Sequence, residues 1–149
     1  MPGNTDPLFT KTTKFNGVLI NTGNASNQGG GTIGTDIFLL GTVDATNGGL
    51  IRRVRFFPTA SVAGTATTAT VGRVFISSVS GGATTSANTH CVDERVLPSV
   101  SASNATTASY FQEFWLPEGL SPGQSILATC HATPAANTAW RAMIWFGDF

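Results

Sequence analysis

Residues 114–128 read FWLPEGLSPGQSILA, and this stretch is the most informative part of the chain about its fold. It contains two prolines, each followed within two residues by a glycine, which is a strong turn signal. The pattern predicts a strand that ends at Leu116, a short crossing that contains Leu120, and a new strand that begins at Ser125. Such a link carries a chain from one sheet of a β-sandwich to the other, as in a Greek-key or jelly-roll connection.

The rest of the chain also has the character of an all-β protein. Thr, Ser, Gly, Asn and Val dominate, and no window keeps the i, i+3, i+4, i+7 apolar spacing of a helix. Apolar and polar residues alternate between Gly, Pro, Asn or Ser clusters, which predicts strands at residues 8–13, 17–21, 36–43, 50–57, 70–78, 91–97, 109–116, 125–132 and 139–146. Seven to nine strands of this kind indicate an antiparallel β-sandwich of jelly-roll type.

The length of 149 residues corresponds to one globular domain. We interpret residues 1–34 as an extended, Gly-rich N-terminal arm with one or two short strands, and residues 35–149 as the jelly-roll sandwich. Within the arm, residues 21–34 (NTGNASNQGGGTIG) have no apolar anchor before Ile33, so this segment is expected to be mobile or extended. An arm that becomes ordered on a partner and a disordered leader are both compatible with this composition.

The charge pattern limits the partners. Eight basic residues balance eight acidic ones, and only 11% of residues are charged, against about 25% in a typical chain. Without a net positive field, binding to nucleic acid or to an anionic membrane surface is disfavoured. The first nine residues lack the features of a secretory signal, and no apolar run approaches the length of a membrane-spanning helix, so we expect a soluble protein made in the cytoplasm.

Two mirrored dipeptides, His90-Cys91 and Cys130-His131, offer the ligand types of a zinc site. Adjacent residues on a strand point to opposite faces, so neither dipeptide can direct both side chains to one metal without a bulge. A Cys–His nucleophile pair would lack an orienting group. We therefore expect no metal and two buried thiols rather than a disulfide.

The run Asp93-Glu94-Arg95 contains the two adjacent acids that come nearest to a catalytic carboxylate pair. Sequence neighbours on a strand diverge, so cross-strand ion pairs with Arg73 or Arg141 are the better interpretation. Gly29 to Gly31 are not followed by the Lys-Ser/Thr pair of a phosphate-binding loop. The sequence therefore predicts no catalytic residue, no cofactor and no enzyme.

The last predicted strand is apolar on both faces. Trp140 and Phe146 alternate with Trp145, so large apolar side chains point both ways. Such a strand lies either between two layers or against another subunit, and we favour the subunit. Trp140, Trp145, Phe146 and Phe149 are the predicted seam of a homo-oligomer.

Arg52, Arg53 and Arg55 form the densest basic patch, with Arg53 and Arg55 predicted on one strand face and Arg52 on the other. Pairing with carboxylates of a partner and a plain solvated face are both possible for them.

The neutral, Thr/Ala/Gly/Asn-rich composition, the LPEGLSPG corner, the segment NGGLIRRVRFFPTA and the ending AWRAMIWFGDF resemble jelly-roll virion proteins of tailed bacteriophages, of the head decoration (cement) type. The resemblance implies a dimeric or trimeric subunit on the outer capsid surface, across gaps between major capsid protein subunits. It also implies that the subunit reinforces the shell against internal DNA pressure without catalytic residues. Residues 1–34 and the strand with Arg52, Arg53 and Arg55 are then expected to contact the capsid.

Two other classes remain open. A carbohydrate-binding or receptor-binding module of a phage tail or fibre would use the same sandwich, and an exposed aromatic side chain beside Asn or Asp in a loop cleft would mark it. An enzyme would need a pocket with converging titratable groups.

Overall fold

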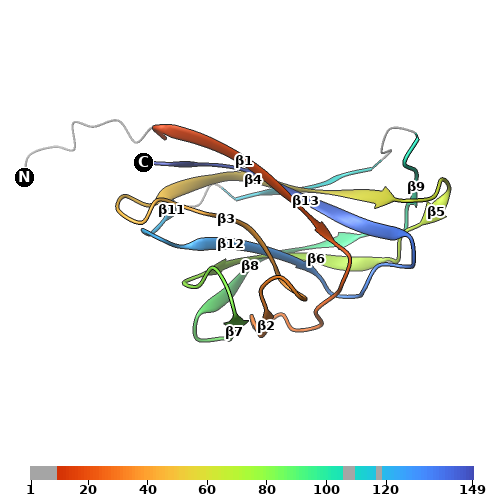
Figure 1. The fold of residues 1–149 in the computed structure, drawn as a ribbon, viewed down its shortest axis with the longest axis horizontal. Helices are drawn as coiled ribbons and strands as arrows, with labels where there is room; N and C mark the ends of the chain where they lie inside the picture. Colours follow the sequence, from red (N-terminus) through yellow and green to blue (C-terminus); the bar gives the residue numbers. More distant parts are fainter. Residues whose placement is uncertain (1–9, 106–109, 117–118) are drawn as a thin grey trace, which may run out of the picture.

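The computed structural model describes residues 10–105, 110–116 and 119–149 (Figure 1). These residues form strands and connecting segments and contain no helix. A membrane-crossing helix is accordingly not found in these ranges. The named strands pair antiparallel throughout, so the predicted all-β, antiparallel class is confirmed.

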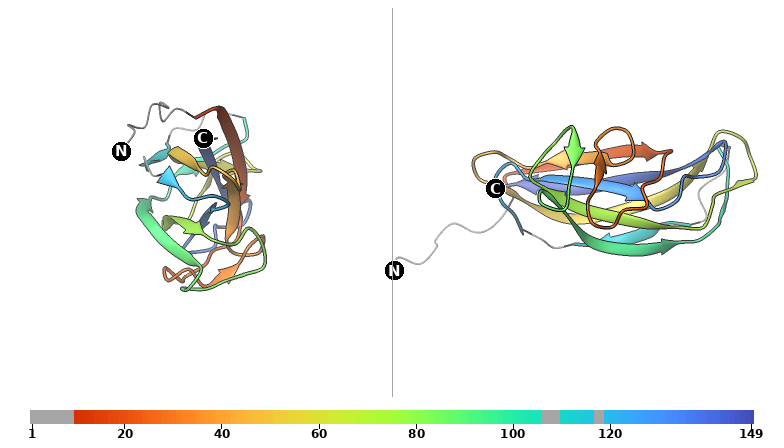
Figure 2. Two further views of the ribbon diagram at one scale, coloured as in Figure 1. Left: turned by 90° about the vertical axis from the view of Figure 1, so that its left-hand side faces the viewer. Right: turned by 90° about the horizontal axis from the view of Figure 1, so that it is seen from below.

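Eight strands of four or more residues make up two sheets in the described chain. Sheet A has the order β1 (Thr12–Ile20), β13 (Thr138–Asp148), β4 (Gly49–Ala60) and β10 (Gln112–Trp115), and β11 (Gly119–Leu120) also pairs with β4. Sheet B has the order β3 (Phe38–Thr42), β12 (Ser125–Cys130), β6 (Thr70–Ser77) and β8 (Thr89–Leu97). Two short ribbons join β2 (Gly31–Thr32) to β7 (Ala83–Thr84), and β5 (Thr65–Ala66) to β9 (Ser101–Ala102). The two main sheets lie face to face as two layers (Figures 1 and 2).

The main core lies between the two sheets and follows from the two-residue period of each strand. Sheet A contributes the buried side chains of Ile20, Ile51, Val54, Phe56, Phe114, Trp140, Ala142, Ile144 and Phe146. Sheet B contributes Leu40, Val74, Leu97, Ile126, Ala128 and Cys130. Because alternate residues point inward, the residues between them form the outer faces of the sheets.

The predicted corner is confirmed. Leu116 directly follows β10, Leu120 belongs to β11, and both side chains are buried in the main core. β10 and the short β11 both pair with β4 of sheet A, and the chain then enters sheet B with β12, so it does cross between layers. Pro117 and Glu118 lie outside the described residues.

The two strands predicted at residues 8–13 and 17–21 are a single strand over their described part. β1 pairs with β13 without interruption from Thr12 opposite Asp148 to Ile20 opposite Trp140. The two predicted strands left residues 14–16 between them, but these residues continue the pairing with β13. The Asn16 side-chain amide donates a hydrogen bond to the Leu40 carbonyl of β3 at 2.8 Å, which gives this polar side chain a partner on sheet B. Residues 8 and 9 lie outside the described residues.

The Gly-rich segment after β1 covers the outer face of sheet B. Arg73 is buried beneath it and donates a hydrogen bond to the Asn24 carbonyl at 3.0 Å. A second apolar cluster of Ile37, Phe75 and Leu127 lies on the same side, with Ile33 packed against it. The ribbon of β2 and β7 is seen beneath sheet B in Figure 1. The described part of the predicted arm is therefore built into the sandwich.

Candidate interaction face on sheet A

Residues 21–37 pack over the outer face of sheet B. Among the described residues, no such segment packs over the outer face of sheet A. Four large hydrophobic side chains are exposed there or at its margin: Phe15 at 58%, Leu19 at 45%, Phe111 at 51% and Trp115 at 66%. Contiguous exposed apolar side chains of this size mark interaction sites more often than scattered ones do.

Strand register aligns the outward side chains in rows across the sheet. The first row runs Phe15, Trp145, Arg53 and Trp115 over β1, β13, β4 and β10. The second row runs Gly17, Met143, Arg55 and Glu113, and the third runs Leu19, Arg141 and Phe57. We call these three rows, with Phe111 and Arg52, the aromatic–arginine face.

The first row is held by ring and cation contacts. The ring centroids of Phe15 and Trp145 are 5.1 Å apart. The guanidinium carbon of Arg53 lies 4.3 Å from the centroid of the Trp145 ring, which is cation–π geometry. The Arg53 guanidinium therefore lies over an indole ring of the neighbouring strand.

The second row contains the carboxylate of the face. Arg55 donates from Nε to Glu113 Oε2 at 2.6 Å, and its Nη2 contacts the same oxygen. Arg53 Nη1 stands farther from that oxygen, at 3.7 Å. Arg55 also lies over the Phe111 ring at 4.5 Å. Glu113 is therefore engaged mainly by Arg55.

Basic charge is concentrated on this face. Four of the eight Lys and Arg residues belong to it: Arg52, Arg53, Arg55 and Arg141. Glu113, opposite Arg55, is the acidic residue in the three rows of this face. The face is thus positively charged although the formal charge of the whole chain is zero.

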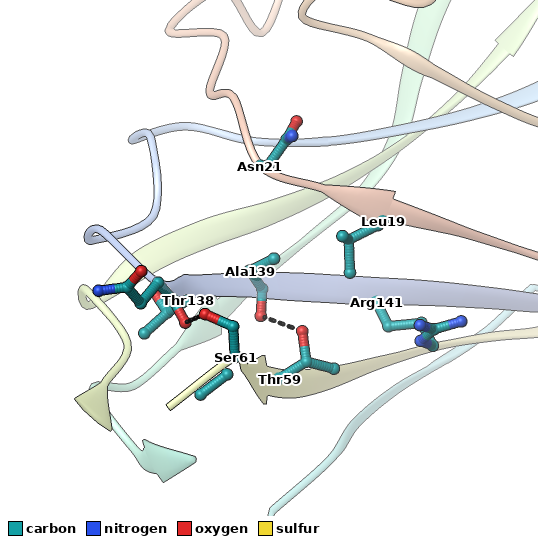
Figure 3. A pocket seen from close by; sticks show the side chains of 9 residues that line it. Leu19, Asn21, Thr59, Ser61, Thr138, Ala139 and Arg141 are labelled. Carbon is teal, nitrogen blue, oxygen red and sulfur yellow. Dashed lines mark hydrogen bonds between the residues drawn. The ribbon is translucent and has the colours of Figure 1, made fainter. Parts of the chain in front are cut away.

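Two pockets lie at opposite ends of the face. The first, of about 490 Å³, is lined by Leu50, Ile51, Arg52, Arg53, Trp115 and Trp145. The second, of about 350 Å³, is lined by Leu19, Asn21, Thr59, Ala60, Ser61, Asn137, Thr138, Ala139 and Arg141 (Figure 3). In the second pocket Thr59 donates to the Ala139 carbonyl at 3.2 Å and Ser61 to the Asn137 carbonyl at 3.4 Å, so these hydroxyl protons are already used. Arg141 supplies the guanidinium of the second pocket, whereas two guanidinium groups, those of Arg52 and Arg53, line the first.

The structure separates the four residues of the predicted oligomer seam. Trp140 and Phe146 are buried in the core of the same chain, which corrects their assignment to a subunit contact. Strand alternation sends these two inward and Trp145 outward. Phe149 lies half-buried just beyond β13.

The three arginines of the predicted capsid contact lie together. A register shift between Trp145 and Phe146 places Arg53 and Ile51 opposite them, so Arg52 is the extra residue of a β-bulge. Arg52 is exposed and lines the first pocket with Arg53, whereas simple alternation predicted it on the opposite face. The alternation of apolar and polar residues along a strand does not reveal where a β-bulge shifts the pattern by one residue.

The cysteines are free thiols, as predicted, and lie on opposite sides of sheet B. Cys130 is buried in the main core and Cys91 is half-buried in the second cluster. Burial raises the pKa of Cys130 to about 12, and burial together with the nearby Glu94 carboxylate raises the pKa of Cys91 to about 11. The described residues contain no cluster of three potential metal ligands. His131 contacts Arg73 instead, with 3.1 Å between Nδ1 and Nη2.

The predicted cross-strand ion pair is present between Arg73 and Glu94, which lie opposite each other on β6 and β8. Their Nε and Oε1 atoms are 2.5 Å apart. Asp93 pairs instead with Arg95 on its own strand, at 3.0 Å. Glu94 and Asp93 therefore form ion pairs within sheet B, and these pairs show no arrangement for catalysis.

A scan of protein-family models and a search of curated proteins both gave no match to this chain. Sequence reasoning had missed Phe15, Phe111, Trp115 and Glu113 as surface residues of one site. The available signal was that Trp115 follows the inward Phe114 and must therefore point outward.

Proposed function

We propose that the protein is a structural virion protein of the jelly-roll head decoration type, which binds the outer capsid surface of a tailed bacteriophage. In this proposal the aromatic–arginine face docks on the major capsid protein and cements neighbouring subunits, without a cofactor or a catalytic residue. The observation that carries the proposal is the alignment of Phe15, Trp145, Arg53 and Trp115 in one exposed row. Tryptophan and arginine are the residue types that most often dominate the binding energy of protein interfaces.

Strand order supports the jelly-roll topology. Counting the eight longer strands along the chain, sheet A contains the first, eighth, third and sixth, and sheet B the second, seventh, fourth and fifth. Two Greek keys wound around each other produce this distribution over two four-stranded sheets.

The size of the face favours a protein partner over a small ligand. β4 has 12 residues, which at about 3.3 Å per residue gives a length of about 40 Å. Four strands about 4.8 Å apart add a width of about 19 Å. The product, about 750 Å², approaches the roughly 800 Å² that each partner contributes to a standard interface. Repetition over a capsid lattice then strengthens attachment through multivalency.

Binding to phage heads tests this proposal. Heads are prepared from a phage that carries this gene after the gene has been deleted, and purified protein is added back and sedimented with them. We expect saturable co-sedimentation of the wild type and at least a tenfold weaker binding of Trp115→Ser. Val96→Ser, which alters a side chain 70% exposed on β8 of sheet B, is the matched control and is expected to bind normally. Failure of the folded wild-type protein to bind such heads contradicts the proposal.

Contact between copies remains part of the proposal. Of the predicted seam residues that lie outside the core, Trp145 belongs to the docking face, so a homodimer or homotrimer would use Phe149. Sedimentation equilibrium of the purified protein measures the mass directly. A monomer at all accessible concentrations contradicts this part.

A second candidate is a carbohydrate- or receptor-binding module of a phage tail or fibre. The observation that favours it is the 66% exposure of Trp115 at the first pocket, where an indole face is open to stacking against a sugar ring. Specific binding on a glycan array, lost in Trp115→Ser, together with no binding to heads, would favour this candidate.

A further inference from the structure

We infer that the docking partner inserts an aspartate or glutamate side chain into the pocket between Trp115 and Trp145, where Arg52 and Arg53 bind its carboxylate. This inference rests on the proposed docking function and specifies the chemistry of the partner. It begins from the imbalance of charge on the face, where four arginines share the surface with one carboxylate, that of Glu113, which lies opposite Arg55.

Glu113 cannot neutralise the arginines at the pocket. Arg55 holds its carboxylate through both Nε and Nη2, whereas Arg53 reaches it only at 3.7 Å. Arg52 makes no ion pair with a described residue. Two guanidinium groups therefore line one pocket with donors that lack a close carboxylate.

Docking makes this shortage costly. A partner that covers the first row removes water from the pocket that Trp115 and Trp145 flank, and an arginine buried without a counter-charge strongly destabilises a complex. The guanidinium carbon of Arg53 already lies 4.3 Å from the centroid of the Trp145 ring, so this side chain loses less entropy when its N–H edge binds a partner. A carboxylate is the group that matches such an edge with paired hydrogen bonds.

The pocket and its surroundings favour a carboxylate from a protein. The pocket volume of about 490 Å³ admits an acidic side chain with its flanking backbone. Beyond it the face continues through Met143, Phe57 and Leu19 to the second pocket, and this apolar surface requires a broad partner. An acidic sugar in the first pocket would leave those rows exposed.

Zero-length crosslinking on phage heads tests the position of the carboxylate. Arg52→Lys and Arg53→Lys each place a primary amine at the pocket, and a water-soluble carbodiimide activates carboxylates of bound heads as O-acylisoureas. Attack by the lysine Nζ forms an amide and releases the urea derived from the carbodiimide. We expect a new covalent product with the major capsid protein that the wild type lacks, mapped by mass spectrometry to an Asp or Glu. Arg95→Lys on β8 of sheet B is the matched control and is expected to give no new product.

Affinity provides the second measurement. We expect the double variant Arg52→Gln/Arg53→Gln to bind heads at least tenfold more weakly than the wild type, and Arg95→Gln to bind within twofold of it. Thermal unfolding confirms that each variant is folded. If the wild type binds heads but the double variant binds equally well and the lysine variants give no product, this inference is overturned and the docking function stands. If the wild type does not bind heads, the docking function itself fails.

Titration with oligogalacturonate, a soluble polyuronate, examines a sugar as the source of the carboxylate. We expect no saturable binding. Binding that requires Arg52 and Arg53, in a protein that does not bind heads, overturns the assignment to a protein partner.

Discussion

Replacing Glu113 by glutamine is expected to lower the stability of the protein and to raise its affinity for heads. The substitution keeps the size of the side chain and removes its negative charge. Within the chain, it removes the charged hydrogen bonds that Arg55 donates to this carboxylate. Toward an acidic partner, it removes a repulsive charge beside Arg53.

The first magnitude follows from the burial of the ion pair, and the second from Coulomb's law for an assumed separation of about 7 Å. The side chains of Glu113 and Arg55 are 17% and 23% exposed, so their pair lies between an exposed pair, worth at most about 1 kcal/mol, and a buried one. We expect a loss of about 1 kcal/mol in the free energy of unfolding, which lowers Tm by about 3 °C in a chain of this size. A partner carboxylate about 7 Å from Glu113 gains about 0.6 kcal/mol in water when the repulsion is removed, or about threefold in Kd.

Calorimetry measures the first effect, and co-sedimentation with heads at low and high salt measures the second. The affinity gain should shrink at 1 M salt, where the screening length is about 3 Å. Glu94→Gln is the matched control, since it breaks the Arg73 pair on sheet B and is expected to lower stability without raising affinity. If folded Glu113→Gln binds heads as the wild type does, or more weakly, at low salt, the partner carries no carboxylate at this face.

Three further predictions concern the parts of the fold that support the face. Phe114→Ala should cost about 3–5 kcal/mol in the free energy of unfolding because the ring is fully buried, whereas Phe111→Ala, at the half-exposed surface, should cost less than about 1 kcal/mol; urea denaturation of the two variants compares them. Arg73→Gln removes the buried donor to the Asn24 carbonyl and should increase amide hydrogen exchange over residues 21–34, measured by mass spectrometry, and unchanged exchange there would contradict the anchoring role. Because burial raises the pKa of Cys130 to about 12, stability is expected to be constant below the ordinary thiol pKa near 9 and to fall as the pH rises above it, by up to about 1.4 kcal/mol per pH unit; denaturation at pH 8, 9 and 10 should show this fall in the wild type and a smaller one in Cys130→Ala.

Local patterns in the sequence predicted much of the fold. The two proline-glycine turns located the crossing between sheets, and alternation correctly separated Trp140 and Phe146 from Arg141 and Trp145. The error for Trp140 and Phe146 came later, when both faces of the strand were assigned to a subunit contact. A strand with apolar residues on both faces does not reveal which face a second sheet covers.

The interaction face depends on information that a single sequence does not carry. Its rows exist because β1, β4 and β10 pair with their neighbours in one particular register, and register between distant strands has no local signal. The bulge at Arg52 likewise becomes visible only when β4 is laid against β13. The packing of residues 21–34 over sheet B was not predicted for a similar reason. The buried Arg73 holds this segment through a hydrogen bond to the Asn24 carbonyl, a contact between distant parts of the chain.

The two outer faces together indicate why the few charges of this chain lie where they do. Sheet B buries Phe75 and Leu127 beneath a segment of its own chain, and Val96 on β8 stays exposed beside this cover. Sheet A leaves its outer aromatic side chains to the solvent, and the guanidinium groups of Arg53 and Arg55 over neighbouring rings keep hydrated charge on that surface. The same guanidinium groups would oppose an apolar partner, because covering them without counter-charges costs more than the aromatic contacts return. On the proposed docking function, the arrangement that keeps hydrated charge on this face would also favour a partner that presents acidic side chains.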